Sequence, residues 1–320
     1  MKVLFVGGIY HVEFSLFHEA RNNPDLTVKF CTFGYSFEEY ASVVNPTTVS
    51  NRGQIDAIKA NYLPDLTIFR NWNASSDSIN DTEVLWQQEI FATLDDNTRP
   101  KDIPTCRLVA HQSKVYAEQH GLLWLPYCAS EYWGVDNPTG VRDIAVAMAT
   151  NLPPDETGGL IKRRSMDILI KPIIEWNPGI VNVYAGLYGG FERVPYLAPC
   201  IKPSYRLLDV TKTLSRVQIY LSPTTIWYDE GCVSQKTYEA MACGCLVMTN
   251  RYVGIEAVLG KDGENLIYAN TPEESLEKVK YYLEHSKERE EIAERGRRFI
   301  TTEYSWMKHL TRLAQDVAQR

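Results

Sequence analysis

The segment Ser234–Thr249 carries the residue types best suited to binding an anionic ligand. It reads as a loop, a short helix that begins near Gln235, a glycine stop and an apolar strand. The start of a helix presents free backbone N–H groups and the positive end of the helix dipole, and Lys236 adds a full charge there. Glu239 follows one turn later and offers a carboxylate to hydroxyl groups. Dipole, cation and carboxylate together predict a pocket for a sugar nucleotide.

Three further residues belong to the same turn. Ser234, Thr237 and Tyr238 surround Lys236, and we expect the backbone N–H groups of Thr237 and Tyr238 to bind phosphate oxygens. Ser234 is also a typical N-cap residue, a role that is compatible with ligand binding.

The stretch also resembles a known family. Glu239-Ala-Met-Ala-Cys-Gly244, Gly254-Ile-Glu-Ala257 and Asp262-Gly-Glu-Asn265 resemble the C-terminal domain of group 1 glycosyltransferases, in particular the CgeB-like, spore-maturation-type branch. The resemblance is strong over about residues 205–315 and only general over the first half. It implies the GT-B architecture, an α/β fold of two Rossmann-like, doubly wound domains that face each other across a cleft. In that family the C-terminal domain holds a nucleotide-sugar donor and the N-terminal domain an acceptor.

The resemblance assigns roles to individual residues. It implies that Glu239 accepts hydrogen bonds from ribose hydroxyls and that Lys236 contacts the donor diphosphate. The family commonly has a second glutamate eight positions earlier, where this chain has Gly231. Glu230 lies one residue before it and takes the catalytic, sugar-contacting role if a bulge in the loop shifts the register; otherwise it is a solvated loop acid.

Two histidines are candidate catalytic residues in the first half. His111 follows the apolar strand expected at 106–110, at the edge where open α/β sheets bind ligands. It is a candidate general base or hydrogen-bond donor to the transferred sugar, with a structural role as the alternative. His11 lies just past a Gly-Gly pair and is a candidate for the same role.

Other residues are expected near the same ligands. The resemblance makes Gly8 part of the cleft wall, with a plain tight turn as the alternative. Arg70 and Asn71 end an apolar strand and are expected to face the cleft. The resemblance also implies that a basic residue of the run Lys162–Arg164, here Arg164, contacts the donor phosphates; a solvated helix face is the alternative.

Alternating apolar strands and amphipathic helices predict two doubly wound domains. We expect an acceptor-side domain at 1–135, a nucleotide-sugar domain at 141–303, and a C-terminal helix at 304–320 that packs back onto the first domain. Strands are expected at 2–6, 26–33, 65–69, 106–110, 122–125, 143–148, 181–185, 218–221 and from 245. Helices are expected after Gly8 and at 160–170, 235–243, 272–284, 287–301 and 305–317. No element is assigned with assurance over 70–104.

Composition limits the class of protein. With 320 residues, 44% hydrophobic and 23% charged, the chain is typical of a globular protein with two domains. The net charge of −7 disfavours a broad nucleic-acid surface. Seven scattered cysteines indicate no disulfide framework, and Cys243-Gly-Cys245 has no second pair to complete a metal site. The first apolar run is too short for a signal peptide and no run reaches membrane-spanning length, so a cytoplasmic protein is predicted.

These observations favour one function over its alternatives. We predict transfer of a sugar from a nucleoside-diphosphate sugar, UDP- or GDP-linked, to an acceptor hydroxyl, without metal or other cofactor and, as the resemblance implies, with retention of configuration. The acceptor stays open between a glycan, a small molecule and a modified nucleic acid. The alternatives are a non-catalytic sugar- or nucleotide-binding protein on a GT-B frame, a glycosyltransferase acting on modified nucleic-acid bases, and an epimerase or phosphorylase.

Overall fold

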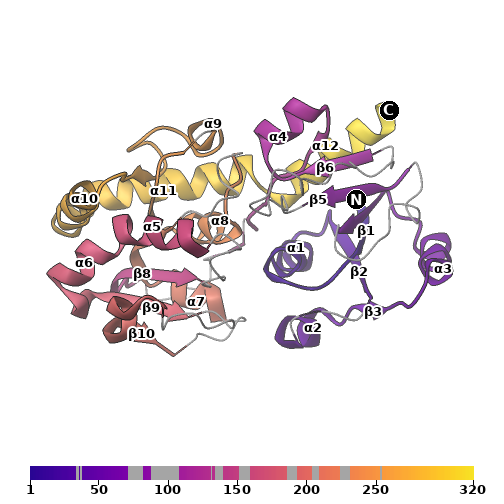
Figure 1. The fold of residues 1–320 in the computed structure, drawn as a ribbon. Coiled ribbons are helices and arrows are strands. Elements are labelled where there is room, and N and C mark those ends of the chain that lie inside the picture. The colour runs from indigo at the N-terminus through magenta and orange to yellow at the C-terminus, as the bar shows by residue number, and fades with distance from the viewer. Residues whose placement is uncertain are drawn as a thin grey trace. The chain divides into compact units, whose positions relative to one another are not determined.

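A computed structural model shows strands and helices that alternate along the chain (Figure 1). It describes residues 1–33, 36, 38–70, 82–87, 108–130, 132–133, 140–150, 159–185, 193–203, 209–223, 231–252 and 254–320. The chain divides into two compact units. Unit 1 comprises Met1–Phe91, Asn97–Tyr132 and Glu303–Arg320, and unit 2 comprises Ala92–Asp96 and Trp133–Thr302.

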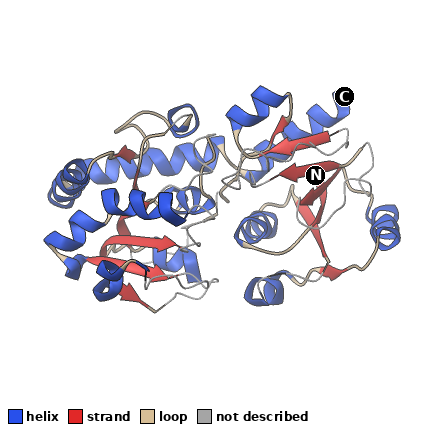
Figure 2. Ribbon diagram, in the orientation of Figure 1, coloured by secondary structure: helices blue, strands red, loops and turns tan. Residues whose placement is uncertain are grey.

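Unit 1 is a parallel sheet whose strands are connected mainly by helices (Figure 2). Its elements are β1 (Lys2–Val6), α1 (His11–Asn22), β2 (Thr27–Thr32), α2 (Glu38–Val44), β3 (Thr47–Thr48), α3 (Arg52–Tyr62), β4 (Leu66–Arg70), β5 (Val84–Gln87), β6 (Leu108–His111), α4 (Lys114–His120), β7 (Leu123–Trp124) and α12 (Trp306–Gln319). Within the described residues the strand order is β3-β2-β1-β4-β5-β6-β7, all parallel. The order reverses between β1 and β4, which is therefore the topological switch point of this sheet.

Unit 2 repeats the same plan with a second parallel sheet. Its elements are β8 (Ile144–Thr150), α5 (Gly159–Leu169), α6 (Lys171–Trp176), η3 (Pro178–Ile180), β9 (Val181–Ala185), η5 (Pro195–Cys200), β10 (Ile201–Lys202), α7 (Val210–Leu214), β11 (Val217–Ser222), α8 (Gln235–Ala242), β12 (Leu246–Thr249), α9 (Ile255–Leu259), β13 (Ile267–Tyr268), α10 (Pro272–Glu284) and α11 (Ser286–Glu303). The described strands are ordered β10-β9-β8-β11-β12-β13, and the order reverses between β8 and β11.

The sequence explains why these sheets are covered on their faces. Strands such as β4 and β12 are buried at every position. Parallel strands that are covered on both faces have sequences that are apolar along most of their length. In unit 2 the helices α5, α6 and α10 pack against one another and, with α11, enclose one apolar core with β8, β9, β11 and β12. The predicted class, doubly wound α/β with two such sheets, is confirmed.

The last helix, α12, packs within unit 1. Trp306 is fully buried, donates its indole N–H to Ser15 Oγ at 3.1 Å, and meets the ring of Trp86 edge-on at 5.9 Å. A backbone hydrogen bond joins Ala129 N to Tyr304 O at 3.0 Å just before the helix. None of the described helices is long and apolar enough to cross a membrane.

Gly296 gives a direct test of the packing of α11. A Cβ atom built there would lie 2.2 Å from the backbone oxygen of Asn265, and backbone cannot move aside as a flexible side chain can. We expect Gly296→Ala to destabilise the protein by about 1–3 kcal/mol, as overpacking does. Gly53 on α3 has only Asn51 Oδ1 nearby, at 3.4 Å, so the control Gly53→Ala should be neutral or stabilise by up to about 1 kcal/mol. Urea unfolding of the two variants measures both effects, and equal stabilities would contradict this packing.

Candidate functional site

The candidate site in unit 2 lies at the carboxyl ends of β8 and β11. The strand order reverses between these two strands, and open α/β sheets bind their ligands at such a point. Helices α5 and α8 are the next described helices after β8 and β11, so both begin at this edge. The strands end in buried polar residues there: Thr150 on β8 and Ser222 on β11.

Local contacts fix the start of α8. Ser234 is the N-cap, and its hydroxyl accepts from Lys236 N at 3.3 Å. The Thr237 hydroxyl lies 2.8 Å from Ser222 Oγ, which anchors the first turn of α8 to the end of β11. Thr237 N–H donates to Ser234 O at 2.9 Å. The predicted phosphate donor Thr237 N–H therefore already has an acceptor within the turn, and Tyr238 is a buried residue of the same helix.

Glu239 is the buried carboxyl group of the site. Its side chain is 1% exposed, and Oε1 has no hydrogen-bond partner among the described residues. Burial raises the pKa of Glu239 to about 8, against the opposing effects of the Lys236 ammonium and a hydrogen bond from Gln235. A buried acceptor without a donor is costly and uncommon in native proteins. A ligand hydroxyl directed at Oε1 would remove that cost.

Two lysines influence each other electrostatically, and one of them, Lys236, also interacts with this carboxyl group. Lys162 stands in the first turns of α5 and Lys236 in the first turn of α8, and both are partly buried. Burial lowers the pKa of Lys162 to about 7, and the repulsion of the Lys236 ammonium adds to the shift. Burial also lowers the pKa of Lys236, and the Glu239 carboxylate opposes that change. Two ammonium groups whose charges repel each other in a partly buried environment favour the binding of an anion near them.

The structure distinguishes Lys162 from Arg164, the residue predicted from the sequence. Arg164 is exposed, whereas Lys162 interacts with Lys236. The sequence showed the basic run but not which member faces the site. Lys162 is thus the residue that the prediction missed.

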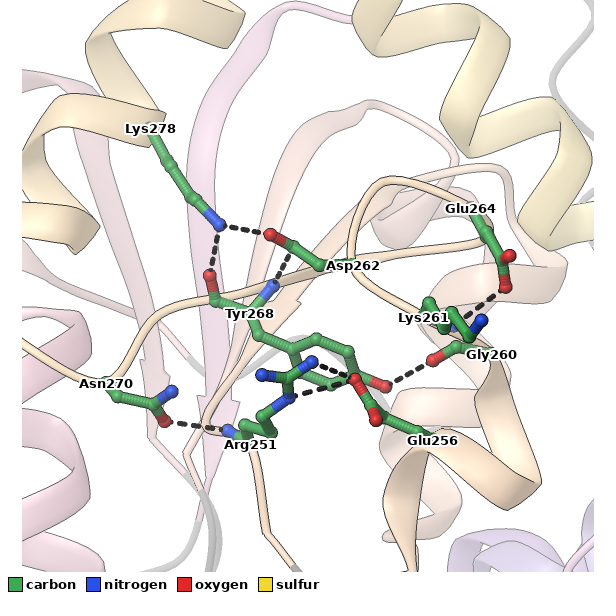
Figure 3. Close-up of polar contacts among 9 residues, drawn as sticks. All are labelled: Arg251, Glu256, Gly260, Lys261, Asp262, Glu264, Tyr268, Asn270 and Lys278. Atoms are coloured by element: carbon green, nitrogen blue, oxygen red, sulfur yellow. Dashed lines mark hydrogen bonds and ion pairs between the residues drawn. The ribbon is translucent and has the colours of Figure 1, made fainter.

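The loop after β12 also follows the carboxyl end of a strand of this sheet, and polar contacts around Arg251 of this loop are drawn in Figure 3. The Tyr252 hydroxyl donates to Cys232 O at 3.1 Å, which ties this loop to the segment before α8. A cavity of about 550 Å³ lies here, lined by Arg251, Tyr252, Gly254, Glu256 and Ala257.

Hydrogen bonds and ion pairs hold this loop in place. Arg251 pairs with Glu256, and Arg251 N donates to Asn270 Oδ1 at 2.9 Å (Figure 3). The Tyr268 hydroxyl donates to Gly260 O at 2.7 Å. Arg251 of the loop is therefore held by Glu256 of α9 and by Asn270 after β13.

Unit 1 places His111 at the carboxyl end of β6. His111 is 1% exposed, and its Nδ1 accepts from Ser113 N at 3.0 Å. Burial is the main cause that lowers the pKa of His111 to about 4. The neutral ring therefore carries its proton on Nε2, which has no partner among the described residues. This tautomer can donate a hydrogen bond through Nε2 but cannot accept a proton there, which argues against the predicted general base.

The switch point of unit 1 contains a buried ion pair. Arg70, at the end of β4, pairs with Glu13 at 3.1 Å and lies 4.3 Å from the centre of the Tyr10 ring. Gly7 is required beside it, because a Cβ there would lie 2.8 Å from Arg70 Cβ. Gly8 is buried at the same edge, directly after β1 and Gly7.

Some predicted residues lie beyond what the structure describes. Glu230 and Asn71 fall outside the described residues, and of His11 only the backbone, at the start of α1, is described. Gly231, which stands where the family has its first glutamate, has a positive φ of 79°. Within the described residues no three His, Cys, Asp or Glu side chains gather as metal ligands.

A known protein family matches most of the second half of the chain. Residues 169–315 match the model of a family described as glycosyl transferase-like. The matched residues are slightly less than half of the chain. The match contains α8 with Lys236 and Glu239, and the glycosyltransferase class predicted from the sequence is confirmed. The CgeB-like branch stays a prediction, and no curated protein matches the sequence.

Solved structures share the fold over the whole chain. Anabaena HepE in complex with UDP-glucose is 16% identical with a TM-score of 0.61, and both chains are covered in full. A glycosyltransferase from Rickettsia africae is 11% identical with a TM-score of 0.67, over 100% of this chain and 99% of the other. The UDP-GlcNAc 2-epimerase of Neisseria meningitidis is 12% identical with a TM-score of 0.58, over 100% of both. At these identities the likeness establishes the GT-B fold.

Proposed function

We propose that the protein transfers a sugar from a UDP-sugar to an acceptor hydroxyl, with the donor bound at the carboxyl edge of unit 2. Lys162 and Lys236 bind the diphosphate, and Glu239 accepts hydrogen bonds from the ribose hydroxyls. The observation that carries the proposal is the pair of mutually repelling, partly buried lysines beside the unpartnered Glu239 oxygen. An anion that also bears hydroxyl groups satisfies all three side chains at once.

The chemistry follows from where charge develops. The bond between the anomeric carbon and the diphosphate oxygen breaks, and negative charge grows on the departing UDP. Two ammonium groups already in place stabilise that charge without reorganisation. The acceptor oxygen forms the new bond to the anomeric carbon and passes its proton to the departing diphosphate oxygen. We infer that the lysines supply the charge stabilisation without a metal ion, and that configuration is retained as in the resembling family.

UDP is the proposed nucleotide because two structures of the same fold hold it. HepE binds UDP-glucose and the Neisseria epimerase binds UDP-GlcNAc. Calorimetric binding and thermal shift with UDP-, GDP-, ADP-, CMP- and dTDP-sugars, with magnesium and with EDTA, test this choice. We expect that only UDP-sugars raise the melting temperature of the protein, and that the increase is the same in EDTA and in magnesium. A preference for another nucleotide, or a strict need for magnesium, would overturn that part of the proposal.

Product analysis then separates the reaction classes. Incubation with a labelled UDP-sugar and a panel of glycans, small molecules and nucleic acids should give a labelled acceptor together with UDP. Donor binding without turnover on any acceptor would instead indicate a binding protein on a GT-B frame. Conversion of the sugar nucleotide without any acceptor would indicate an epimerase.

The pH dependence of donor binding is expected to report Lys162. Its pKa is about 7, so it is charged below that pH and loses its proton above it. The advantage of the native protein over Lys162→Met should therefore shrink from about pH 6 to about pH 8, by up to tenfold in affinity. UDP-glucose is the ligand to use, because its phosphates do not titrate in this range. An advantage that stays constant with pH would contradict the assignment.

A further inference from the structure

A second cavity of unit 2 lies at the opposite, amino edge of the sheet. It has a volume of about 510 Å³, and its lining includes Arg142, Arg289, Arg297, Glu290 and Glu294. Arg142 precedes β8, and the cavity also reaches Cys243 and Gly244, between the end of α8 and the start of β12. Strand β11 separates the two edges by its six residues, which is about 20 Å. This arginine cavity is thus distinct from the proposed donor site.

Two of the three arginines have little compensation from carboxylates. Arg142 donates to Val217 O at 2.7 Å and to Cys243 O at 2.8 Å, and within the described residues it forms no ion pair. Arg289 is 6% exposed and donates to Tyr282 O at 2.9 Å. Its contact with Glu290 is long, 3.4 Å, and the Glu290 side chain is 64% exposed. Carbonyl groups satisfy these donors but do not neutralise the charges.

The third arginine is different. Arg297 makes two hydrogen bonds to Glu294, at 2.8 and 3.1 Å, and Glu294 also holds Arg298 at 2.8 Å. The cavity therefore keeps an excess of positive charge around Arg142 and Arg289. Burial lowers the pKa of Arg289, Glu290 opposes this, and the nearby Arg142 adds to the lowering. Two guanidinium groups that line one cavity and repel each other are an arrangement that an oxyanion stabilises.

We propose that the arginine cavity binds a phosphate-type oxyanion, either inorganic phosphate or the phosphate group of a small metabolite. A guanidinium group can donate two parallel hydrogen bonds to two oxygens of such an anion, and the volume of the cavity is that of a small-molecule site. The cavity admits more than a bare phosphate, so the two sources must be compared by experiment.

Calorimetric titration of inorganic phosphate into the full chain tests the site, at constant ionic strength set with potassium chloride. Glycerol 2-phosphate is the matched phosphomonoester probe. Saturable binding of either probe is expected. Arg289→Gln and Arg297→Gln should each weaken it at least fivefold, and Glu290→Gln should strengthen it at least twofold by removing a competing negative charge. The probe that binds tighter identifies the source of the phosphate group.

Matched controls make the result decisive. Arg298→Gln is the control for Arg297→Gln. Arg298 carries the same charge, is on the same helix and also pairs with Glu294, but it does not line the cavity. Phosphate affinity of Arg298→Gln should stay within twofold of the native value. The titrations are repeated in the Lys236→Met background, which weakens phosphate binding at the proposed donor site; the same losses in Arg289→Gln and Arg297→Gln are expected there, because Lys236 does not line the arginine cavity. Absence of saturable binding in that background, or equal losses in Arg298→Gln, would overturn the proposal. Arg297→Gln and Glu290→Gln keep the test valid if Arg289→Gln does not fold.

Discussion

Replacing Lys236 with methionine should reduce sugar transfer by at least a hundredfold, about 2.7 kcal/mol in transition-state stabilisation. The reason is that Lys236 lies in the first turn of α8 beside Lys162, where charge on the departing diphosphate grows. Lys162→Met should act in the same direction. Single-turnover rates with a saturating UDP-sugar measure both effects.

Binding measurements identify which part of the donor the lysines contact. UDP affinity should fall at least tenfold in Lys236→Met, while affinity for uridine, which has no phosphate, should not change. Equal losses for both ligands would remove the diphosphate assignment. Arg164→Met is the matched control, because Arg164 is on the same helix as Lys162 but exposed; UDP affinity should stay at the native value.

Stability separates a ligand-binding role from a structural one. Burial lowers the pKa of both lysines, so each charge costs stability in the free protein. The methionine variants should therefore melt at the native temperature or above it when no ligand is present. A variant that lost both UDP binding and stability would indicate a structural role for the lysine.

Local sequence signals predicted the elements that position this site. Ser234 before an apolar-periodic run, followed by Gly244, predicts a helix over 235–243, and α8 spans Gln235–Ala242 with Ser234 as its N-cap. N-caps and glycine stops act within one turn, so the sequence contains them in full. The same holds for α10, which begins at Pro272 after the N-cap Thr271.

The choice between Lys162 and Arg164 could not be made from the sequence. Residues two apart on a helix differ in direction by about 200°, so Lys162 and Arg164 cannot both face the site. Which one does depends on how α5 packs on its sheet. That packing is set by residues far away in the chain, such as Ser275, whose hydroxyl donates to Leu169 O at 2.8 Å.

Short strands without turn signals also escaped prediction. β5 comprises only Val84–Gln87 and belongs to a stretch to which no element was assigned. It is a strand because β4 and β6 pair with it on either side, through contacts such as Phe69 with Leu85 and Ala110 with Trp86. Such a strand is specified by its neighbours in the sheet more than by its own four residues.

Glu239→Gln should weaken the binding of both UDP and uridine by at least tenfold, about 1.4 kcal/mol. The proposed contact is to ribose hydroxyls, which both ligands carry, so the pattern differs from that of the lysines. A glutamine keeps the size of the side chain and one acceptor oxygen, but an amide nitrogen replaces the second oxygen, so one of the two acceptors is lost. Glu277→Gln, an exposed glutamate on α10, is the control and should leave both affinities unchanged.

The stability of the same variant should depend on pH in a defined direction. The pKa of Glu239 is raised from 4.5 to about 8, so the folded protein holds a proton that the unfolded chain releases. The contribution of that proton to the free energy of unfolding is largest below about pH 4.5 and declines as the pH rises towards 8. Glu239→Gln lacks this decline, so its melting temperature should equal that of the native protein near pH 5 and exceed it near pH 8. If Glu239→Gln gains stability at high pH and binds uridine more weakly, the buried carboxyl group serves ligand binding at the expense of folding stability. If the variant loses stability at every pH, Glu239 is part of the structural core.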